Sequence, residues 1–278
     1  KINQNLILPL AKAGDENPAV LENGVVRTPP GYKEAYQKYI EDGWTSLSCD
    51  PKYGGQGMPK TVSAFFDEML SAASLSFKLY SELSIGAYNC INHHASDEIK
   101  NKYLPKIVEG KWSGTMCLTE PGAGSDLGQV RTKATAQDDG SYLVEGNKIF
   151  ITAGEHDLTD NIIHLVLART PGAPEGIRGI SMFVVPKFLI NSDGSLGERN
   201  KVECANIEEK MGIHGSCTCV LNFTNATGYL VGELNKGIQN MFVMMNAARL
   251  MVGLQGLGVA ERATQNAITY AKDRKQGR

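Results

Sequence analysis

The 278-residue chain lacks several patterns that would assign it to a functional class at once. It has no basic excess, with 28 Lys and Arg against 30 Asp and Glu, and this balance argues against nucleic-acid binding. It has no block of like charge, which argues against a solvating tail. The Gly-x-x-x-x-Gly-Lys-Ser/Thr phosphate loop of NTPases is also absent. What remains is an ordinary soluble globular composition, in a chain long enough for two domains or one large one.

Cysteine is scarce and does not form a recognisable pattern. The chain has six cysteines and no Cys-x-x-Cys pair. Cys217 and Cys219 are the nearest pair, on one face of an expected strand, with no further metal-ligand pattern around them. We therefore predict reduced, buried thiols in a reducing compartment, and no metal site.

The histidines also lack metal-binding spacing. His93 and His94 are adjacent, so on a helix they would point about 100° apart and could not easily share an ion. His156 with Asp157 and Asp160 could form a metal triad or a surface turn, and we favour the turn. The other histidines carry no motif.

Both ends of the chain interrupt a pattern. It begins with Lys and ends at KDRKQGR inside a helical segment, so we expect a piece of a longer protein, and a missing signal peptide says little. The most apolar window, 241–260, contains Asn246, Arg249 and Gln255. Because an unpaired Arg at a bilayer centre is costly, we predict a buried bundle helix and no transmembrane segment.

The first third of the chain has helical periodicity. The stretch 32–43 places Tyr and Ile on one stripe, and 61–75 spaces apolar residues three and four apart. A further apolar segment covers 77–92. The next helix is expected to begin at the N-cap Ser96 and to stop near Gly110.

The pattern then changes to short segments rich in Val, Ile, Phe and Thr, separated by Gly, Asp and Pro. These are YLVEGNKIFIT (142–152), IIHLVLART (162–170), GISMFVVPK (179–187), NKVECANI (200–207) and CTCVLNFTNA (217–226). No helices alternate with them, so they predict an antiparallel β domain. The fold class is therefore α+β, with helices in 1–112, a β domain in 113–232 and helix again in 233–278.

The stretch 116–134, MCLTEPGAGSDLGQVRTKA, resembles a phosphate-binding loop. A dinucleotide fingerprint fails, because Gly122 and Gly124 fit but Leu127 stands where the third glycine belongs. The following residues alternate like a strand. What remains is a loop between strands, either a plain turn or one whose N–H groups approach an anion with Ser125 as an added donor.

Several motifs, in order, resemble the flavin-dependent acyl-CoA dehydrogenases over essentially the whole chain. They are YLPKIVEGK, CLTEPGAGSD, FIT at 150–152, GISMFVVPK, EKMGIHGSCTCVLNF, LVGELNKG and ERATQNAITYAKDRKQ. SCDPKYGGQGMPK and GSLGERNKVECANIE resemble the subgroup that includes 3-methylthiopropanoyl-CoA dehydrogenases. The resemblance implies an N-terminal all-helical domain, a middle β-barrel or sandwich, and the start of a C-terminal helical bundle.

The resemblance implies FAD as the cofactor. The matching FAD-binding positions are Met116, Cys117, Leu118, Thr119, Gly124, Ser125, Phe150, Ile151, Thr152, Arg274 and Gln276. Thr119 would donate to the pyrimidine side of the flavin and Thr152 would bond at N5. Gly124 and Ser125 would lie near the pyrophosphate, while the two C-terminal residues would reach the FAD of a neighbouring subunit. Such donors stabilise negative charge on a flavin that accepts a hydride.

The same resemblance assigns acyl-CoA contacts to Ser125, Asn246 and Arg249. An Arg in an apolar helix must be paired or functional if it is buried. The α-proton of a thioester needs a positioned carboxylate. Part of the family carries that Glu where this chain has Ala248, and most members carry it further along. We therefore predict no catalytic residue in this chain, a Glu beyond Arg278, and a fragment that is inactive alone.

The predicted function is FAD-dependent α,β-dehydrogenation of an acyl-CoA thioester. The resemblance also implies an electron-transferring flavoprotein or similar acceptor, a homodimer or homotetramer, and a bacterial cytoplasmic or mitochondrial-matrix location. Two alternatives remain open. One is a same-fold flavin-dependent monooxygenase or oxidase that acts on a non-CoA substrate, and the other is a non-catalytic flavin-binding fragment.

Overall fold

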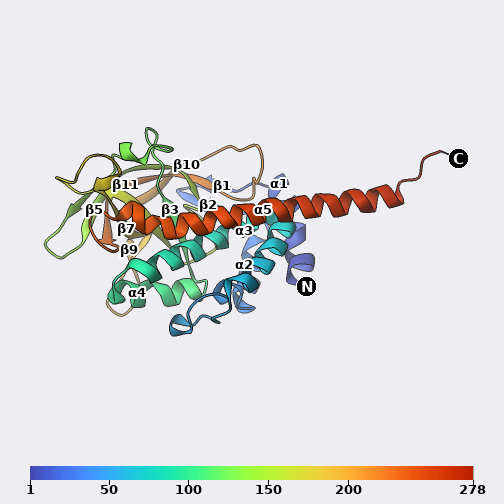
Figure 1. Cartoon of the computed structure of the whole chain (residues 1–278), viewed down its shortest axis with the longest axis horizontal. Helices are drawn as coiled ribbons and strands as arrows, with labels where there is room; N and C mark the ends of the chain where they lie inside the picture. Colours follow the sequence, from blue (N-terminus) through green and yellow to red (C-terminus); the bar gives the residue numbers. More distant parts are fainter. Residues whose placement is uncertain (278) are drawn as a thin grey trace.

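Helices come first along the chain in the computed structural model, which describes residues 1–277 (Figure 1). The elements are η1 (Asn3–Ile7), α1 (Leu8–Glu16), the hairpin β1 (Val20–Glu22) and β2 (Val25–Arg27), α2 (Tyr32–Glu41), η2 (Trp44–Ser46), η3 (Pro51–Tyr53), α3 (Lys60–His94) and α4 (Asp97–Val108). The predicted helices are thus present.

Local signals set the ends and breaks of these helices. Helix α3 is interrupted at Ser74, with φ −157° and ψ 102°, which separates the two apolar segments expected there. Ser96 caps α4, since its side chain accepts a hydrogen bond from the N–H of Ile99 at 3.3 Å. Pro105 lies inside the last turns of α4.

The middle of the chain forms the strands of a barrel and of a separate two-stranded sheet, in which β8 pairs with β9. They are β3 (Trp112–Cys117), β4 (Lys133–Ala136), β5 (Tyr142–Thr152), β6 (Asn161–Arg169), β7 (Ile180–Pro186), β8 (Phe188–Ile190), β9 (Leu196–Arg199), β10 (Val202–Ile207) and β11 (Thr218–Leu230), with short η4 (Leu127–Gln129) and η5 (Gly176–Gly179). Pairing runs from β11 through β5, β4, β6 and β7 back to β11, while β10 and β3 attach outside this ring. The predicted β domain is confirmed, in its barrel form.

Two pairings differ from the antiparallel expectation: β4 meets β6 in parallel at Lys133 and Arg169, and β3 does so over its whole length. Strand β3 runs parallel to β6, from Trp112 beside Asn161 to Cys117 beside Val166. The chain between them includes β4 and β5, so it is long enough for the crossover that a parallel pair requires. Helix α3 covers β3 closely, because a Cβ on Gly114 would lie 2.3 Å from that of Ala87.

The last helix, α5 (Gly237–Asp273), lies along α3, and its final turns extend beyond the other elements (Figure 1). Gly258 allows this close approach, since a Cβ there would lie 2.6 Å from the backbone oxygen of Glu68. By length and composition α5 could also cross a membrane. The expectation of a buried helix is wrong for the part of the chain that the structure describes, because only 11% of its apolar window is buried. A helix buries only the face that meets a neighbour, and α5 packs mainly on α3.

All six cysteines are buried and free within residues 1–277, as expected for buried thiols. They are Cys49, Cys90, Cys117, Cys204, Cys217 and Cys219.

Candidate active site

The expected cofactor-binding stretch begins on β3 and continues into a loop that lies against β5. Met116 and Cys117 end the strand, and Cys117 is fully buried. The N–H of Ile149 donates to the oxygen of Thr119 at 2.9 Å. Glu120 and Ala123 then bond each other through both backbone groups, at 2.8 and 3.0 Å. The glycine-rich turn therefore begins from a backbone segment that these hydrogen bonds fix at the edge of the barrel.

A buried ion pair holds this loop. The ammonium of Lys148, on β5, is completely buried and donates to Glu120 at 2.8 Å and to the carbonyl of Leu118 at 3.0 Å. The Glu120 carboxylate also accepts from the N–H of Arg131 at 2.7 Å and from the N–H and hydroxyl of Thr132 at 3.0 and 2.5 Å. Both ends of the loop are thus tied to one carboxylate.

The electrostatics keep this carboxylate ionised. Burial opposes its charge, but Lys148 and the donors on Thr132 and Arg131 together hold the pKa of Glu120 below its usual value. Burial lowers the pKa of Lys148, and Glu120 offsets part of that effect. Neither Glu120 nor Lys148 was predicted from the sequence. Lys148 could have been noticed because it lies four residues after Val144 and so points to the same, buried face of the strand. A charged side chain at a buried position needs a partner.

Phe150 is displayed by a β-bulge in β5. The register passes from Cys219 beside Ile151 to Leu221 beside Lys148, so β5 holds one extra residue. Phe150 takes a left-handed conformation, with φ +59°, and its side chain is 59% exposed. A bulky residue in this region is strained, and such strain clusters at functional sites.

Hydroxyl groups without partners complete this region. The side chains of Thr119 and Thr152 are partly exposed, Ser125 is exposed, and none of the three hydroxyls makes a hydrogen bond within residues 1–277. Gly122 and Gly124 give the loop an open backbone, and a Cβ at Gly122 would meet nothing within 4 Å. An exposed aromatic ring, free hydroxyl donors and a glycine-rich turn fit a flavin with its phosphates.

A small cavity of about 80 Å³ lies between the α2–η2 region, α3 and α5. It is lined by Tyr39, Trp44, Leu47, Ser48, Ser63, Phe66, Asp67, Ser81, Glu82, Leu83, Ile85, Gly86, Asn89, Met244, Ala247, Ala248 and Met251. Most of its lining is apolar. Glu82 forms an ion pair with buried Lys78 and accepts from Gln255 at 2.7 Å. Burial raises the pKa of Asp67 to about 6, although Lys78 opposes the shift.

The other predicted ligand residues on α5 lie apart from this cavity's lining. Arg249 is exposed, donates to Asn246 Oδ1 at 2.9 Å and lies 5.5 Å from the Phe242 ring centre. Because Arg249 is exposed, its charge does not need a buried partner. Arg274 and Gln276 follow the end of α5 and are exposed. The C-terminal end of α5 extends away from the barrel (Figure 1).

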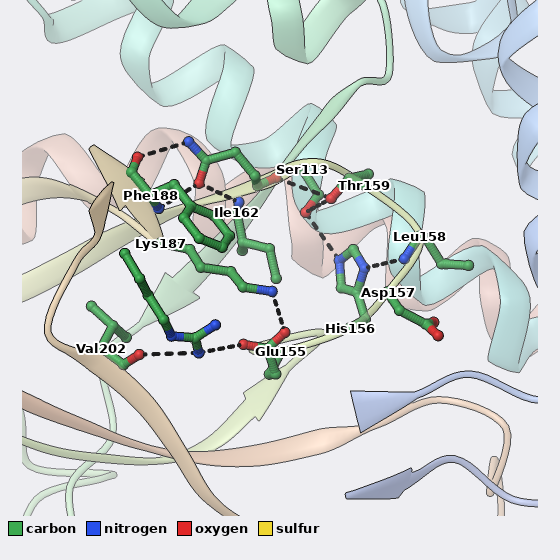
Figure 2. Close-up of polar contacts among 12 residues, drawn as sticks. Ser113, Glu155, His156, Asp157, Leu158, Thr159, Ile162, Lys187, Phe188 and Val202 are labelled. Atoms are coloured by element: carbon green, nitrogen blue, oxygen red, sulfur yellow. Dashed lines mark hydrogen bonds and ion pairs between the residues drawn. The ribbon is translucent and has the colours of Figure 1, made fainter. Parts of the chain in front are cut away.

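His156 is not in a surface turn, contrary to the expectation. Figure 2 shows its ring inside a polar network, where Nε2 and the Ser113 hydroxyl are 3.0 Å apart and Nδ1 accepts from the N–H of Leu158 at 3.2 Å. Neighbouring Asp157 pairs with Lys33 at 2.9 Å. The polar letters of AGEHDLTD suggested a turn, but tertiary hydrogen bonds allow the imidazole to be buried.

Comparisons with known proteins agree with this architecture. The N-terminal domain model of the acyl-CoA dehydrogenases matches residues 18–111, and the middle domain model matches residues 115–226. A 3-methylmercaptopropionyl-CoA dehydrogenase from Ruegeria pomeroyi is 52% identical over 273 residues, which is 98% of this chain and 46% of that protein.

Two solved structures are also similar. The butyryl-CoA dehydrogenase of Megasphaera elsdenii has a TM-score of 0.80 and 28% identity, covering 99% of this chain and 67% of that one. An acyl-CoA dehydrogenase from Bacillus anthracis complexed with FAD has a TM-score of 0.74 and 28% identity, covering 88% and 40%. The chain spans about half the length of the first curated relatives it matches. Because the two domain models together match most of its residues, the chain belongs to the acyl-CoA dehydrogenase family.

Proposed function

We propose that this chain is the flavin-holding part of an FAD-dependent acyl-CoA dehydrogenase that converts an acyl-CoA thioester to its trans-2-enoyl product. The observation that carries this proposal is the pair of unpartnered hydroxyls, Thr119 and Thr152, on segments fixed side by side by Lys148, with the Phe150 ring exposed beside them. FAD, when bound, supplies the hydride acceptor. The relatives whose names specify butyryl-CoA and 3-methylmercaptopropionyl-CoA support a thioester substrate.

Each group of residues in the candidate site would have its own role. Thr119 and Thr152 would donate hydrogen bonds to the flavin ring, Phe150 would stack on it, and Gly124 with Ser125 would hold the pyrophosphate. The acyl group would occupy the small apolar cavity of α3 and α5. We expect the group that accepts the α-proton to lie outside residues 1–277, because Ala248 occupies the position that carries it in part of the family.

Partners follow from the same proposal. An electron-transferring flavoprotein or a similar acceptor would reoxidise the flavin. In a homodimer or homotetramer, Arg274 and Gln276 would reach the pyrophosphate of a neighbour's FAD, a contact that suits a guanidinium fork.

The proposed reaction is tested with flavin and thioester together. We expect the full-length holoenzyme to be yellow and to bleach anaerobically when butyryl-CoA is added, with a dye as final acceptor. The 278-residue chain alone should not turn over, because it lacks the proton acceptor. Oxygen consumption with reduced flavin and no response to CoA esters would instead indicate a monooxygenase or oxidase, and refusal of FAD would contradict both.

The role of Phe150 is tested by truncating its ring. Phe150→Ala should weaken FAD binding about fivefold, since an aromatic stacking contact contributes roughly 1 kcal/mol, with little loss of fold stability because the residue is 59% exposed. Flavin fluorescence quenching measures the first effect and thermal unfolding of the flavin-free protein measures the second.

The matched control for this experiment is Phe65→Ala on α3, where an equally exposed Phe lies outside the candidate site. It should leave FAD affinity unchanged. Equal FAD affinities for the Phe150 variant and the unaltered protein would remove Phe150 from the flavin site.

A further inference from the structure

The small cavity has a second cavity beside it. The second measures about 530 Å³ and is lined by Lys1, Ile2, Asn3, Gln4, Leu8, Trp44, Phe66, Met69, Ala72, Ala73, Glu261, Arg262 and Gln265. Two residues, Trp44 and Phe66, line both cavities. They therefore lie between the small space and the larger one.

The Trp44 and Phe66 rings stack in parallel, with centroids 3.9 Å apart and an interplanar angle of 1°. Phe66 is 7% exposed, and Tyr39 packs against it with ring centroids 6.1 Å apart. Stacked rings at this separation are in van der Waals contact, so no methylene chain can pass between them.

The size of the small cavity limits what it can hold. An engineered apolar cavity of about 150 Å³ binds benzene, with six heavy atoms. By the same proportion, about 80 Å³ holds roughly three or four heavy atoms. The neighbouring cavity offers the apolar side chains of Leu8 and Met69, which suit a longer hydrocarbon tail.

We propose that the Trp44–Phe66 stack sets the upper limit of acyl chain length, so that the protein takes short acyl thioesters and excludes long ones. This inference rests on the proposed function, because it assigns the small cavity to the acyl group. Opening the stack would join the two cavities into one apolar channel.

The test is Phe66→Ala in the full-length holoenzyme, with butyryl-CoA and dodecanoyl-CoA as probes. The ratio of kcat/KM for dodecanoyl-CoA over butyryl-CoA should rise at least tenfold, because each buried methylene contributes about fourfold. Calorimetric binding of dodecanoyl-CoA should tighten in parallel, which gives a readout independent of turnover. An unchanged ratio and unchanged affinity would overturn the assignment.

Matched variants keep the test interpretable. Phe66→Leu retains a core side chain and should raise the ratio less, so a folding defect in the alanine variant does not end the experiment. Phe65→Ala, one residue away on the exposed face, should leave the ratio unchanged. Equal use of both thioesters by the unaltered protein would refute the length limit alone, whereas failure to bind any acyl-CoA would refute the proposed function.

Discussion

Replacing Lys148 with Met is expected to lower the free energy of unfolding by about 3–5 kcal/mol and to abolish FAD binding. The substitution keeps the aliphatic stem but removes the partner of Glu120, and breaking a buried ion pair leaves an uncompensated charge of this cost. The Leu118 carbonyl loses its donor at the same time, so the loop before Thr119 loses its anchor. Urea denaturation and flavin titration measure the two losses.

A double variant separates charge from packing. Combining Lys148→Met with Glu120→Gln removes both charges while one amide oxygen can still accept from Thr132. It should be more stable than Lys148→Met alone, with a coupling energy of about 1–3 kcal/mol in the double-mutant cycle. Lys133→Met, on the neighbouring strand, controls for the same replacement at an exposed position. A loss below about 1 kcal/mol for Lys148→Met would show that the pair does not hold the loop.

Acidification should unfold the protein through two buried imidazoles. Burial, together with the charge of Lys187, lowers the pKa of both His156 and His164 to about 3. The unfolded chain binds these protons near pH 6.5. Their contribution to stability is therefore complete above pH 6.5 and is lost as the pH falls toward 3. Two protons give a slope of about 1.4 kcal/mol per pH unit at pH 6.5, which rises toward about 2.7 kcal/mol per pH unit near pH 5.

Denaturant titrations between pH 5 and 6.5 measure this slope. His164→Gln should reduce it by about 1.4 kcal/mol per pH unit near pH 5, since one proton is removed from the linkage. In the unaltered protein the Thr115 hydroxyl lies 2.8 Å from His164 Nδ1. The Gln amide can still form a hydrogen bond with that hydroxyl. His93→Gln, at an exposed position, is the control. A slope equal in the His164 variant and the unaltered protein would mean that this imidazole is protonated in the fold.

The strands were predictable because their signal is local. The alternation in 142–152 and the apolar run in 162–170 gave β5 and β6 to within a residue or two. The direction of β3 was not predictable, because a parallel partner distant in sequence leaves no mark on the six residues of the strand itself. The break at Ser74 separated two helical segments that periodicity had already distinguished.

Parts of the site that depend on tertiary contacts escaped prediction. The glycine-rich loop was found because its motif is compact, whereas the Glu120–Lys148 pair joins two segments that carry no shared pattern. His156 looked like a turn residue because local polarity does not report a distant hydroxyl such as that of Ser113. The exposure of α5 was also not predicted, because the apolar composition of a helix does not show how many of its faces contact a neighbour.

The parallel pairing of β3 with β6 has a consequence for the order of folding. Strand β3 ends where the glycine-rich loop begins, and its hydrogen-bonding partner β6 lies beyond the intervening β4 and β5 in the sequence. Such a non-local closure is slow compared with forming helices or hairpins. The edge of the barrel that carries the glycine-rich loop should therefore become protected from hydrogen exchange later in refolding than the local β6–β7 hairpin.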